Sequence, residues 1–291
     1  MPHNDHWRLQ RKVMHSAVGS QALKPCKAFQ EGEGKILMCE LLDSPVDFAL
    51  HFEKYAYSLV SILRYSRRVA SKDDVTIYCQ DDGITIIQVP GSYWLEAIPE
   101  LQYLPSWIYS LPSRLKRRSK AVARYWWGLV LKGNQALEPN FAKTLVKSKE
   151  EQGLTELDIA EMVANLIGGG MDTTASTLHT LVLDLRVFPD AQLKAHEELD
   201  RVIGHDRSRT WDDLDQLSYR AAVLKEAMRW RSVTTMGGFA HTPTQEDEYR
   251  GYRFHAGIPI FSNFWGIHRN LKDFPGPDIF LPDRYLPSEY T

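Results

Sequence analysis

The feature that most constrains the fold is a helical run over residues 155–188 with three consecutive glycines at its centre. Thr155 and Asp158 have the spacing of a capping box, which marks the start of a helix. Apolar residues then recur at helical spacing, at Ile159, Met162, Val163, Leu166 and Ile167. The run therefore predicts a long, mostly buried helix.

The centre of this run is unfavourable for a helix. The glycines at 168–170 each cost about 1 kcal/mol relative to alanine, and the aspartate and two threonines at 172–174 are also poor helix formers. Such a penalty indicates that another group approaches the backbone there, or that the helix opens. The alternative is a helix broken into two by a glycine turn.

The glycine patch and the residues behind it resemble the long helix of the cytochrome P450 family (also written P-450), the haem-thiolate monooxygenases. The family pattern is Ala or Gly, Gly, any residue, Asp or Glu, Thr, then Thr or Ser. It is filled here by Gly169, Gly170, Met171, Asp172, Thr173 and Thr174. The resemblance implies that Asp172 and Thr173 relay protons, and that Gly169, Gly170 and Thr174 face oxygen and substrate.

A second motif lies near the N-terminus, where Trp7 and Arg11 stand one helical turn apart. Taken alone, they form an ordinary cation–π or amphipathic pair. The resemblance implies instead that Trp7 and Arg11 bind a haem propionate, together with His241 of a Gly-x-x-His stretch. Metal chelation by His3 and His6 is a weaker reading than solvated surface.

Two further motifs lie in the C-terminal part. Glu226 and Arg229 are three residues apart, a spacing that brings a carboxylate and a guanidinium together on one helix face. They match the Glu-x-x-Arg motif of the family, and residues 280–285 resemble its Phe-x-Pro-Glu-Arg-Phe segment. The resemblance then predicts a buried structural triad of Glu226, Arg229 and Arg284. One departure is Ser232, where the family commonly has proline.

These motifs extend the resemblance over nearly the whole chain, and residues 229–269 look most like fungal members that act in secondary metabolism. The expected fold is mainly α with a small β component, a P450-like domain spanning residues 1–291. The domain is expected to be partial. The N-terminal anchor, most of the first sheet, and the C-terminal haem-ligand loop with its helix are expected to be missing.

The cysteines decide the expectation about chemistry. Cys26, Cys39 and Cys79 include no C-x-x-C pair, which argues against a disulfide framework or a zinc site and favours buried small apolar side chains. The resemblance implies haem as cofactor, bound through a cysteine thiolate after the Phe-x-Pro segment. No cysteine follows Cys79, so no metal ligand is assigned and the chain is expected to be inactive.

Three other readings remain open. The chain can be a fragment of an active, membrane-anchored monooxygenase that has been delimited wrongly at both ends. It can be a non-catalytic helical protein that binds a partner through an exposed apolar patch. It can also be a relic without a stable fold, because a core that lacks its flanks and cofactor loses much of a marginal stability.

Partners and location follow partly from composition. A formal net charge of −2 gives no reason to expect nucleic acid. The resemblance implies an apolar small-molecule substrate, an NADPH-dependent reductase and the endoplasmic reticulum membrane. The chain shows no apolar run of about 18 to 20 residues and no signal peptide, so a cytoplasmic location is the alternative.

Residues 90–120 predict a surface feature. Prolines and aromatic residues crowd positions 90–111, and the basic run RLKRRSK follows at 114–120. This composition suits a mobile lid, packing against the body, or contact with an anionic membrane surface.

Helices are further expected at 45–69, 190–204, 218–231 and 263–268, with Gly204 as a C-cap and a second capping box at Thr210 and Asp213. Two strands are expected at 249–254 and 258–262, joined as a hairpin.

Overall fold

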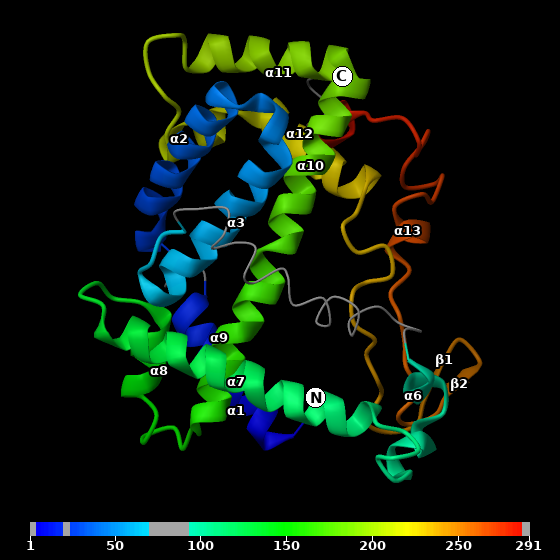
Figure 1. Cartoon of the computed structure of the whole chain (residues 1–291). Coiled ribbons are helices and arrows are strands. Elements are labelled where there is room, and N and C mark those ends of the chain that lie inside the picture. Colours follow the sequence, from blue (N-terminus) through cyan, green and yellow to red (C-terminus); the bar gives the residue numbers. More distant parts are fainter. Residues whose placement is uncertain (1–3, 20–23, 70–92, 287–291) are drawn as a thin grey trace. The chain divides into compact units, whose positions relative to one another are not determined.

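The computed structural model describes residues 4–19, 24–69 and 93–286 (Figure 1). These residues form two compact units, residues 1–172 and residues 173–291, each with its own hydrophobic core. Both units are mainly helical, and the regular strands described are two short ones in the second unit. The expected class, mainly α with a small β component, is confirmed.

The first unit is built on helices α3, α7, α8 and α9, which pack on one another. Its core includes Val130, Leu145, Ile159 and Val163, all fully buried. The elements in chain order are α1 (Asp5–Val18), η1 (Lys24–Cys26), α2 (Lys27–Asp43), η2 (Pro45–Asp47), α3 (Phe48–Tyr65), α6 (Trp94–Ala97), η3 (Pro99–Tyr103), α7 (Leu111–Gln135), α8 (Phe141–Lys147) and α9 (Glu156–Gly170).

The helix expected over 45–69 is shorter than predicted. Its first turn is the 3₁₀ helix η2, and α3 ends at Tyr65 because Ser66 adopts the left-handed backbone conformation, with φ of 56°. The prediction placed the end of the helix too late because the sequence does not indicate that Ser66 adopts a left-handed conformation.

Helix α9 starts as the capping box predicts. The backbone N–H of Thr155 donates to Asp158 Oδ2 at 2.8 Å, and the backbone N–H of Asp158 donates to Thr155 Oγ1 at 3.1 Å. The exchange satisfies two N–H groups that a helix start leaves without partners.

The glycine patch ends α9. A Cβ atom on Gly170 would lie 2.7 Å from Val60 Cγ2, so this glycine lets α3 approach the backbone of α9. A Cβ on Gly168 or Gly169 would meet nothing within 4 Å. The chain bends at Met171, and a second helix, α10 (Asp172–Val187), follows. The prediction of one unbroken helix is therefore wrong, and the broken-helix alternative describes the chain.

The second unit packs α10, α11 and α12 around an aromatic core. The small face of α11, with Ala191 and Ala195, meets Tyr219, Val223 and Trp230 of α12. The elements in chain order are α10, α11 (Pro189–Val202), η4 (Trp211–Gln216), α12 (Ser218–Trp230), β1 (Asp247–Tyr249), β2 (Tyr252–Phe254), α13 (Phe264–Ile267) and η5 (Pro282–Tyr285).

The ends of these helices follow the sequence signals. Gly204 has φ of 73° just after α11, and the Thr210–Asp213 capping box opens η4. Glu198 of α11 accepts the backbone N–H groups of Tyr219 at 2.8 Å and Arg220 at 2.9 Å, which caps α12 from a neighbouring helix. This carboxylate joins the two helices that carry the core.

The expected hairpin is wrong in its boundaries. Residues 247–249 and 252–254 form the antiparallel strands β1 and β2, and the turn falls at Arg250 and Gly251, which have φ of 51° and 81°. Two successive positive φ values are typical of a type I′ turn. Residues 258–262 form no regular strand, and Ile260 instead makes an isolated bridge with His241.

Candidate functional site

The best-defined polar site lies in the second unit around Glu226. This carboxylate is fully buried on α12, and both its oxygens accept hydrogen bonds from Arg229, from Nε at 2.7 Å and from Nη2 at 2.8 Å. Its Oε1 atom also accepts the backbone N–H of Leu281 at 2.8 Å and Arg284 Nε at 3.2 Å. The structure thus brings together the three residues of the expected triad.

The two arginines extend this network to loop carbonyls. Arg229 Nη1 donates to the carbonyl of His268 at 2.9 Å, and Arg284 Nη1 donates to the carbonyl of Pro275 at 3.2 Å. Trp230 Nε1 donates to the carbonyl of Asp278 at 2.8 Å. The network therefore holds the irregular segment 268–284, which has little regular structure of its own, against α12.

Ser232, the departure from the family pattern, has a defined place in this network. Its hydroxyl donates to the carbonyl of Met228 at 2.8 Å, and its Oγ lies 2.8 Å from Nδ1 of His268. Since the hydroxyl carries one hydrogen, donation to Met228 requires His268 Nδ1–H to donate to Ser232. Burial, with the charges of Arg229 and Arg269, lowers the pKa of His268 and favours its neutral form.

Asp184 of α10 is a functional candidate that the sequence interpretation missed. It is fully buried, and among the described residues neither carboxylate oxygen has a hydrogen-bond partner. Burial raises the pKa of Asp184 to about 7. The negative charge of Glu226 also raises it, whereas the positive charge of Arg231 lowers it. The sequence did contain a signal, because Asp184 is an acid within the apolar run LVLDLRV. No basic residue lies three or four positions from it, so no partner of opposite charge shares its helix face.

Trp7 and Arg11 lie together on α1 of the first unit. The Arg11 guanidinium stands over the Trp7 ring, 5.3 Å from its centroid, and within the described part of the chain it forms no ion pair. A half-exposed indole with an unneutralised guanidinium is an arrangement that can accept an anionic group.

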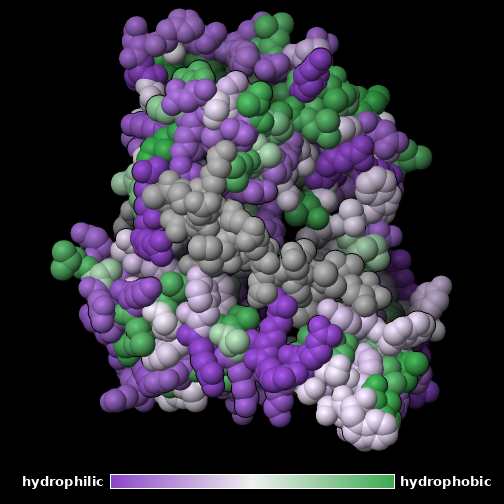
Figure 2. Space-filling model, viewed as in Figure 1, coloured by the Kyte–Doolittle hydropathy of each residue, from purple (hydrophilic) through white to green (hydrophobic). Residues whose placement is uncertain are grey.

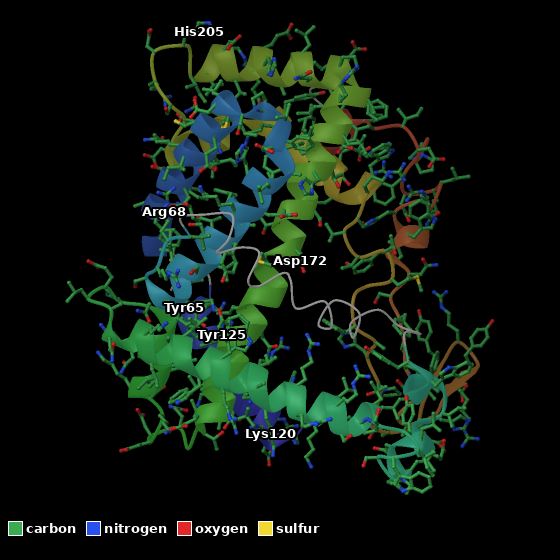
Figure 3. The ribbon with its side chains drawn as sticks, viewed as in Figure 1. Tyr65, Arg68, Lys120, Tyr125, Asp172 and His205 are labelled. Atoms are coloured by element: carbon green, nitrogen blue, oxygen red, sulfur yellow. The ribbon has the colours of Figure 1, made fainter. Side chains whose placement is uncertain are left out.

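The residues of the central motif lie at the junction of α9 and α10. Gly169 is exposed in the last turn of α9, and Asp172 is an exposed carboxylate at the first position of α10 (Figure 3). Thr173 is exposed and Thr174 is half-buried. The carbonyl of Thr173 accepts the hydroxyl of Thr177 at 2.7 Å, so this turn of α10 carries hydroxyl groups along one side.

His241 lies in the second unit, in the bridge with Ile260. Its backbone N–H donates to the Ile260 carbonyl at 2.9 Å, and its side chain is exposed. Of the other candidate ligands, His6 pairs with Asp158 at 2.9 Å, whereas His3 lies outside the described residues. The part of the chain that the structure describes holds no cluster of three or more metal-ligating side chains.

The aromatic segment of the first unit, residues 93–110, has exposed rings. Trp94, Tyr103 and Trp107 are 74%, 82% and 84% exposed. Helix α7 begins directly behind it and carries exposed basic side chains, among them Lys120 (Figure 3), and residues 101–137 contain no acid. Figure 2 shows the segment as a pale and green area beside purple side chains. Of the described helices, none is long and apolar enough to cross a membrane.

The family model "Cytochrome P450" matches residues 1–290 of the chain. The chain belongs to the cytochrome P450 family. Its curated relatives include the cytochrome P450 monooxygenases polD of Polytolypa hystricis, 33% identical over 98% of the chain, and fsoB of Humicola fuscoatra, 32% identical over 97%. Both are fungal proteins, and the chain spans 56% and 55% of their lengths.

Solved P450 structures share this fold. A zebra fish cytochrome P450 with abiraterone matches with a TM-score of 0.77 and 22% identity, over 98% of this chain and 66% of that one. A zebra fish cytochrome P450 with progesterone matches with a TM-score of 0.78 and 21% identity, over 98% of this chain and 68% of that one. The expected P450-like helical fold is confirmed.

Haem, which the P450 family implies, fits this chain only in part. The Trp7–Arg11 pair suits a propionate, as argued above. The described cysteines do not suit the axial position, because Cys26 is buried with a thiol pKa raised by burial, and a thiol is not the ligand form. Cys39 is exposed on α2, and Cys79 lies outside the described residues.

Proposed function

We propose that this P450 chain belongs to a monooxygenase that oxidises an apolar small molecule in a fungal secondary-metabolite pathway, with an NADPH-dependent reductase as its electron donor. The observation that carries the proposal is the triad of Glu226, Arg229 and Arg284, in which family motifs 58 residues apart meet at one buried carboxylate. The fungal monooxygenases among its relatives support the same reading.

Within this proposal, Asp172 and Thr173 handle a proton. A carboxylate and a hydroxyl on consecutive residues at the start of α10 can hold and pass a proton to a group bound nearby. Gly169, Gly170 and Thr174 then face oxygen and substrate, although Gly170 also has the packing role described above.

The activity is tested on the reading frame that the transcript encodes, sequenced through both ends in the source organism. Coexpressed with a P450 reductase, it is expected to convert apolar substrates in an NADPH-dependent reaction. The variant T173A is expected to form product at least about tenfold more slowly. The matched control is S176A, one turn along α10. Equal activity of T173A and S176A would contradict the proton role.

We further propose that residues 1–291 alone form no thiolate-ligated haem and are catalytically inactive. The argument is the chemistry of the described cysteines: burial raises the thiol pKa of Cys26, and Cys39 is an exposed residue of α2. The purified polypeptide, mixed with haem, reduced and treated with carbon monoxide, is expected to lack the absorption band of thiolate ligation. Appearance of that band would contradict this part of the proposal.

The aromatic segment and α7 support a position at the endoplasmic reticulum membrane. Trp94, Tyr103 and Trp107, the most exposed rings of this segment, are largely free of packing against the unit, which weakens the alternative of burial on the body. Aromatic rings favour the membrane interface, and each basic residue near an anionic surface adds about 1 kcal/mol of attraction. We therefore propose that residues 93–120 rest on an anionic membrane surface.

Cosedimentation with phosphatidylserine vesicles tests this contact. The double variant W94S/W107S is expected to lose most of the bound fraction, because both rings are removed from the interface. The matched control L137S changes a residue of the same unit that is 97% exposed but lies outside the aromatic segment. The proposed surface would be excluded if W94S/W107S bound these vesicles as well as L137S does. It would also be excluded if the unmodified chain bound neutral vesicles as well as phosphatidylserine vesicles.

A further inference from the structure

In the first unit, a single carboxylate bonds to two helices. Asp158 is 5% exposed, and its Oδ2 atom accepts the backbone N–H of Thr155 at 2.8 Å and the Thr155 hydroxyl at 2.6 Å, which completes the start of α9. Its other oxygen, Oδ1, faces α1. That oxygen accepts Gln10 Nε2 at 3.1 Å and lies 2.9 Å from His6 Nε2. The cap of α9 is therefore also the attachment point of α1.

The distances around Asp158 Oδ1 bear on the tautomer of His6. His6 Nε2 and Gln10 Nε2 are 3.1 Å apart, and both are close to the same carboxylate oxygen. If Nε2 of His6 carried a lone pair, it would face a carboxylate oxygen at 2.9 Å with no hydrogen between them, which is repulsive. The contact with Asp158 therefore favours the forms in which Nε2 carries a hydrogen, which are the imidazolium form and one neutral tautomer.

This attachment sets the rotation of α1. His6, Gln10 and Val13 lie on one face of the helix, and Val13 is buried in the same core as Ile159 of α9. Trp7 and Arg11 each follow an attached residue by one position, which turns them by about 100° around the helix axis. The contacts of Asp158 and the burial of Val13 thus agree on one rotation of α1, and this rotation sets the direction in which Trp7 and Arg11 point.

We propose that Asp158 is a positioning residue that fixes α1 on the start of α9, and that His6 strengthens this attachment when its imidazole is protonated. An imidazolium adds a charge-assisted hydrogen bond to a carboxylate that already accepts one from Gln10. The consequence for Trp7 and Arg11 rests on the proposed function, which assigns them to an anionic group. The attachment itself does not depend on that assignment.

The charges around His6 agree with this arrangement. Burial alone would raise the pKa of Asp158, but the hydrogen bonds from Thr155 and the charge of His6 hold it below its usual value. Glu161, one turn further along α9, also faces His6, and burial with the charge of Asp158 raises its pKa. On α8, which also packs on α1, Lys143 donates to the carbonyl of Ala136 and is engaged away from His6.

Hydrogen exchange of the full chain, read from peptides within residues 5–18 and corrected for intrinsic exchange rates, tests the proposal. In the unmodified chain, protection of α1 is expected to be several-fold higher at pH 5.5 than at pH 8. The variant D158N is expected to lower that protection about tenfold, because it removes the charge that both donors use. H6L is expected to lower it and to abolish the pH dependence.

Two further variants separate positioning from general stability. H6Q keeps a hydrogen-bond donor without a titrating group, so protection of α1 is expected to be retained and to become independent of pH. E156Q removes a neighbouring exposed carboxylate of α9 and is expected to behave as the unmodified chain. Peptides of α12, residues 218–230, report whether a variant remains folded.

The proposal is overturned if α1 of H6L is as protected as α1 of the unmodified chain at both pH values, or if H6Q keeps the pH dependence. Because His6 is half-exposed, with 51% of its side chain accessible, these variants do not threaten the core even if D158N fails to fold. The readout needs neither haem nor substrate. Failure of the monooxygenase proposal would therefore leave this result unchanged.

Discussion

Two carboxylates of the second unit, Glu226 and Asp184, are equally buried but have opposite surroundings. Both residues have no exposed surface. Glu226 accepts hydrogen bonds from two arginines and a backbone N–H group. Neither oxygen of Asp184 has a partner among the described residues, and burial raises its pKa to about 7. Burial alone therefore does not decide what an acid does in this unit; the donors that reach it do.

Removing the satisfied acid should cost the most. In E226Q, the buried guanidinium of Arg229 loses the negative charge that compensates it, and we expect the free energy of unfolding to fall by about 3 to 5 kcal/mol. Urea unfolding followed by circular dichroism measures this loss. The control E197Q makes the same change at an exposed position of α11. A loss in E226Q no larger than in E197Q would show that the network contributes little.

Removing the unsatisfied acid, Asp184, should raise the free energy of unfolding at high pH, whereas E226Q lowers it. The Asp184 carboxyl titrates near 3.8 in the unfolded chain and near 7 in the folded chain, so the folded state binds the extra proton between these values. Its contribution to the free energy of unfolding therefore falls as the pH rises from about 4 to about 7, by as much as about 4 kcal/mol, and then levels off.

The variant D184N should lack this dependence and be more stable than the unmodified chain at pH 8. Urea unfolding at pH 4.5, 6 and 8 gives the difference between the two proteins, in which the other titrating groups cancel. D190N, at an exposed aspartate of α11, serves as the control. A difference that stays constant over this pH range would mean that Asp184 titrates normally in the folded chain.

Loss of the outer arginine should have a smaller effect. Arg284 reaches Glu226 through Nε at 3.2 Å, and its other hydrogen bonds to carbonyls are 3.2 and 3.5 Å long. Since Arg229 remains paired, we expect R284M to lower the free energy of unfolding by about 1 to 2 kcal/mol. Chemical denaturation compares R284M with R284K, which keeps the charge without the planar fork. If both variants match the unmodified chain, the segment 279–285 is held without Arg284, through packing and through the backbone N–H of Leu281, which donates to Glu226.

The smallest effect is expected at Ser232. Its hydroxyl joins the Met228 carbonyl to His268 at the edge of the network, where the side chain is half-buried. We expect S232A to cost about 0.5 to 1 kcal/mol and to raise the proportion of the other His268 tautomer. Nitrogen NMR shifts of His268 report the tautomer. An unchanged His268 spectrum in S232A would remove Ser232 from the network.

The contacts that could be predicted were those between residues close in sequence. Capping boxes at Thr155 and Thr210 join residues three apart, and so does the pair Glu226–Arg229, so the spacing determines the geometry. Arg284 lies 58 residues from Glu226 and was placed by family resemblance. Asp158 bonds to Gln10 across 148 residues, and its role in the capping box gave no reason to look for another partner.

The errors arose where a backbone conformation, and not a side-chain pattern, decides the structure. The run 249–254 alternates like a strand, but the positive φ values of Arg250 and Gly251 turn it into a hairpin. The arginine at the first turn position hides the turn, because a non-glycine residue seldom adopts that conformation. Gly251 was the signal that should have divided the run.

Gly170 and Val60 compete for the same space between α9 and α3. A methyl group at position 170 would meet Val60 Cγ2 at 2.7 Å, so any side chain at position 170 requires the Val60 side chain or one of the two helices to shift. A smaller residue in place of Val60 would relieve this contact and make room for a larger residue at 170. Positions 60 and 170 are therefore expected to vary together among sequences that share this fold, although 110 residues separate them in the chain.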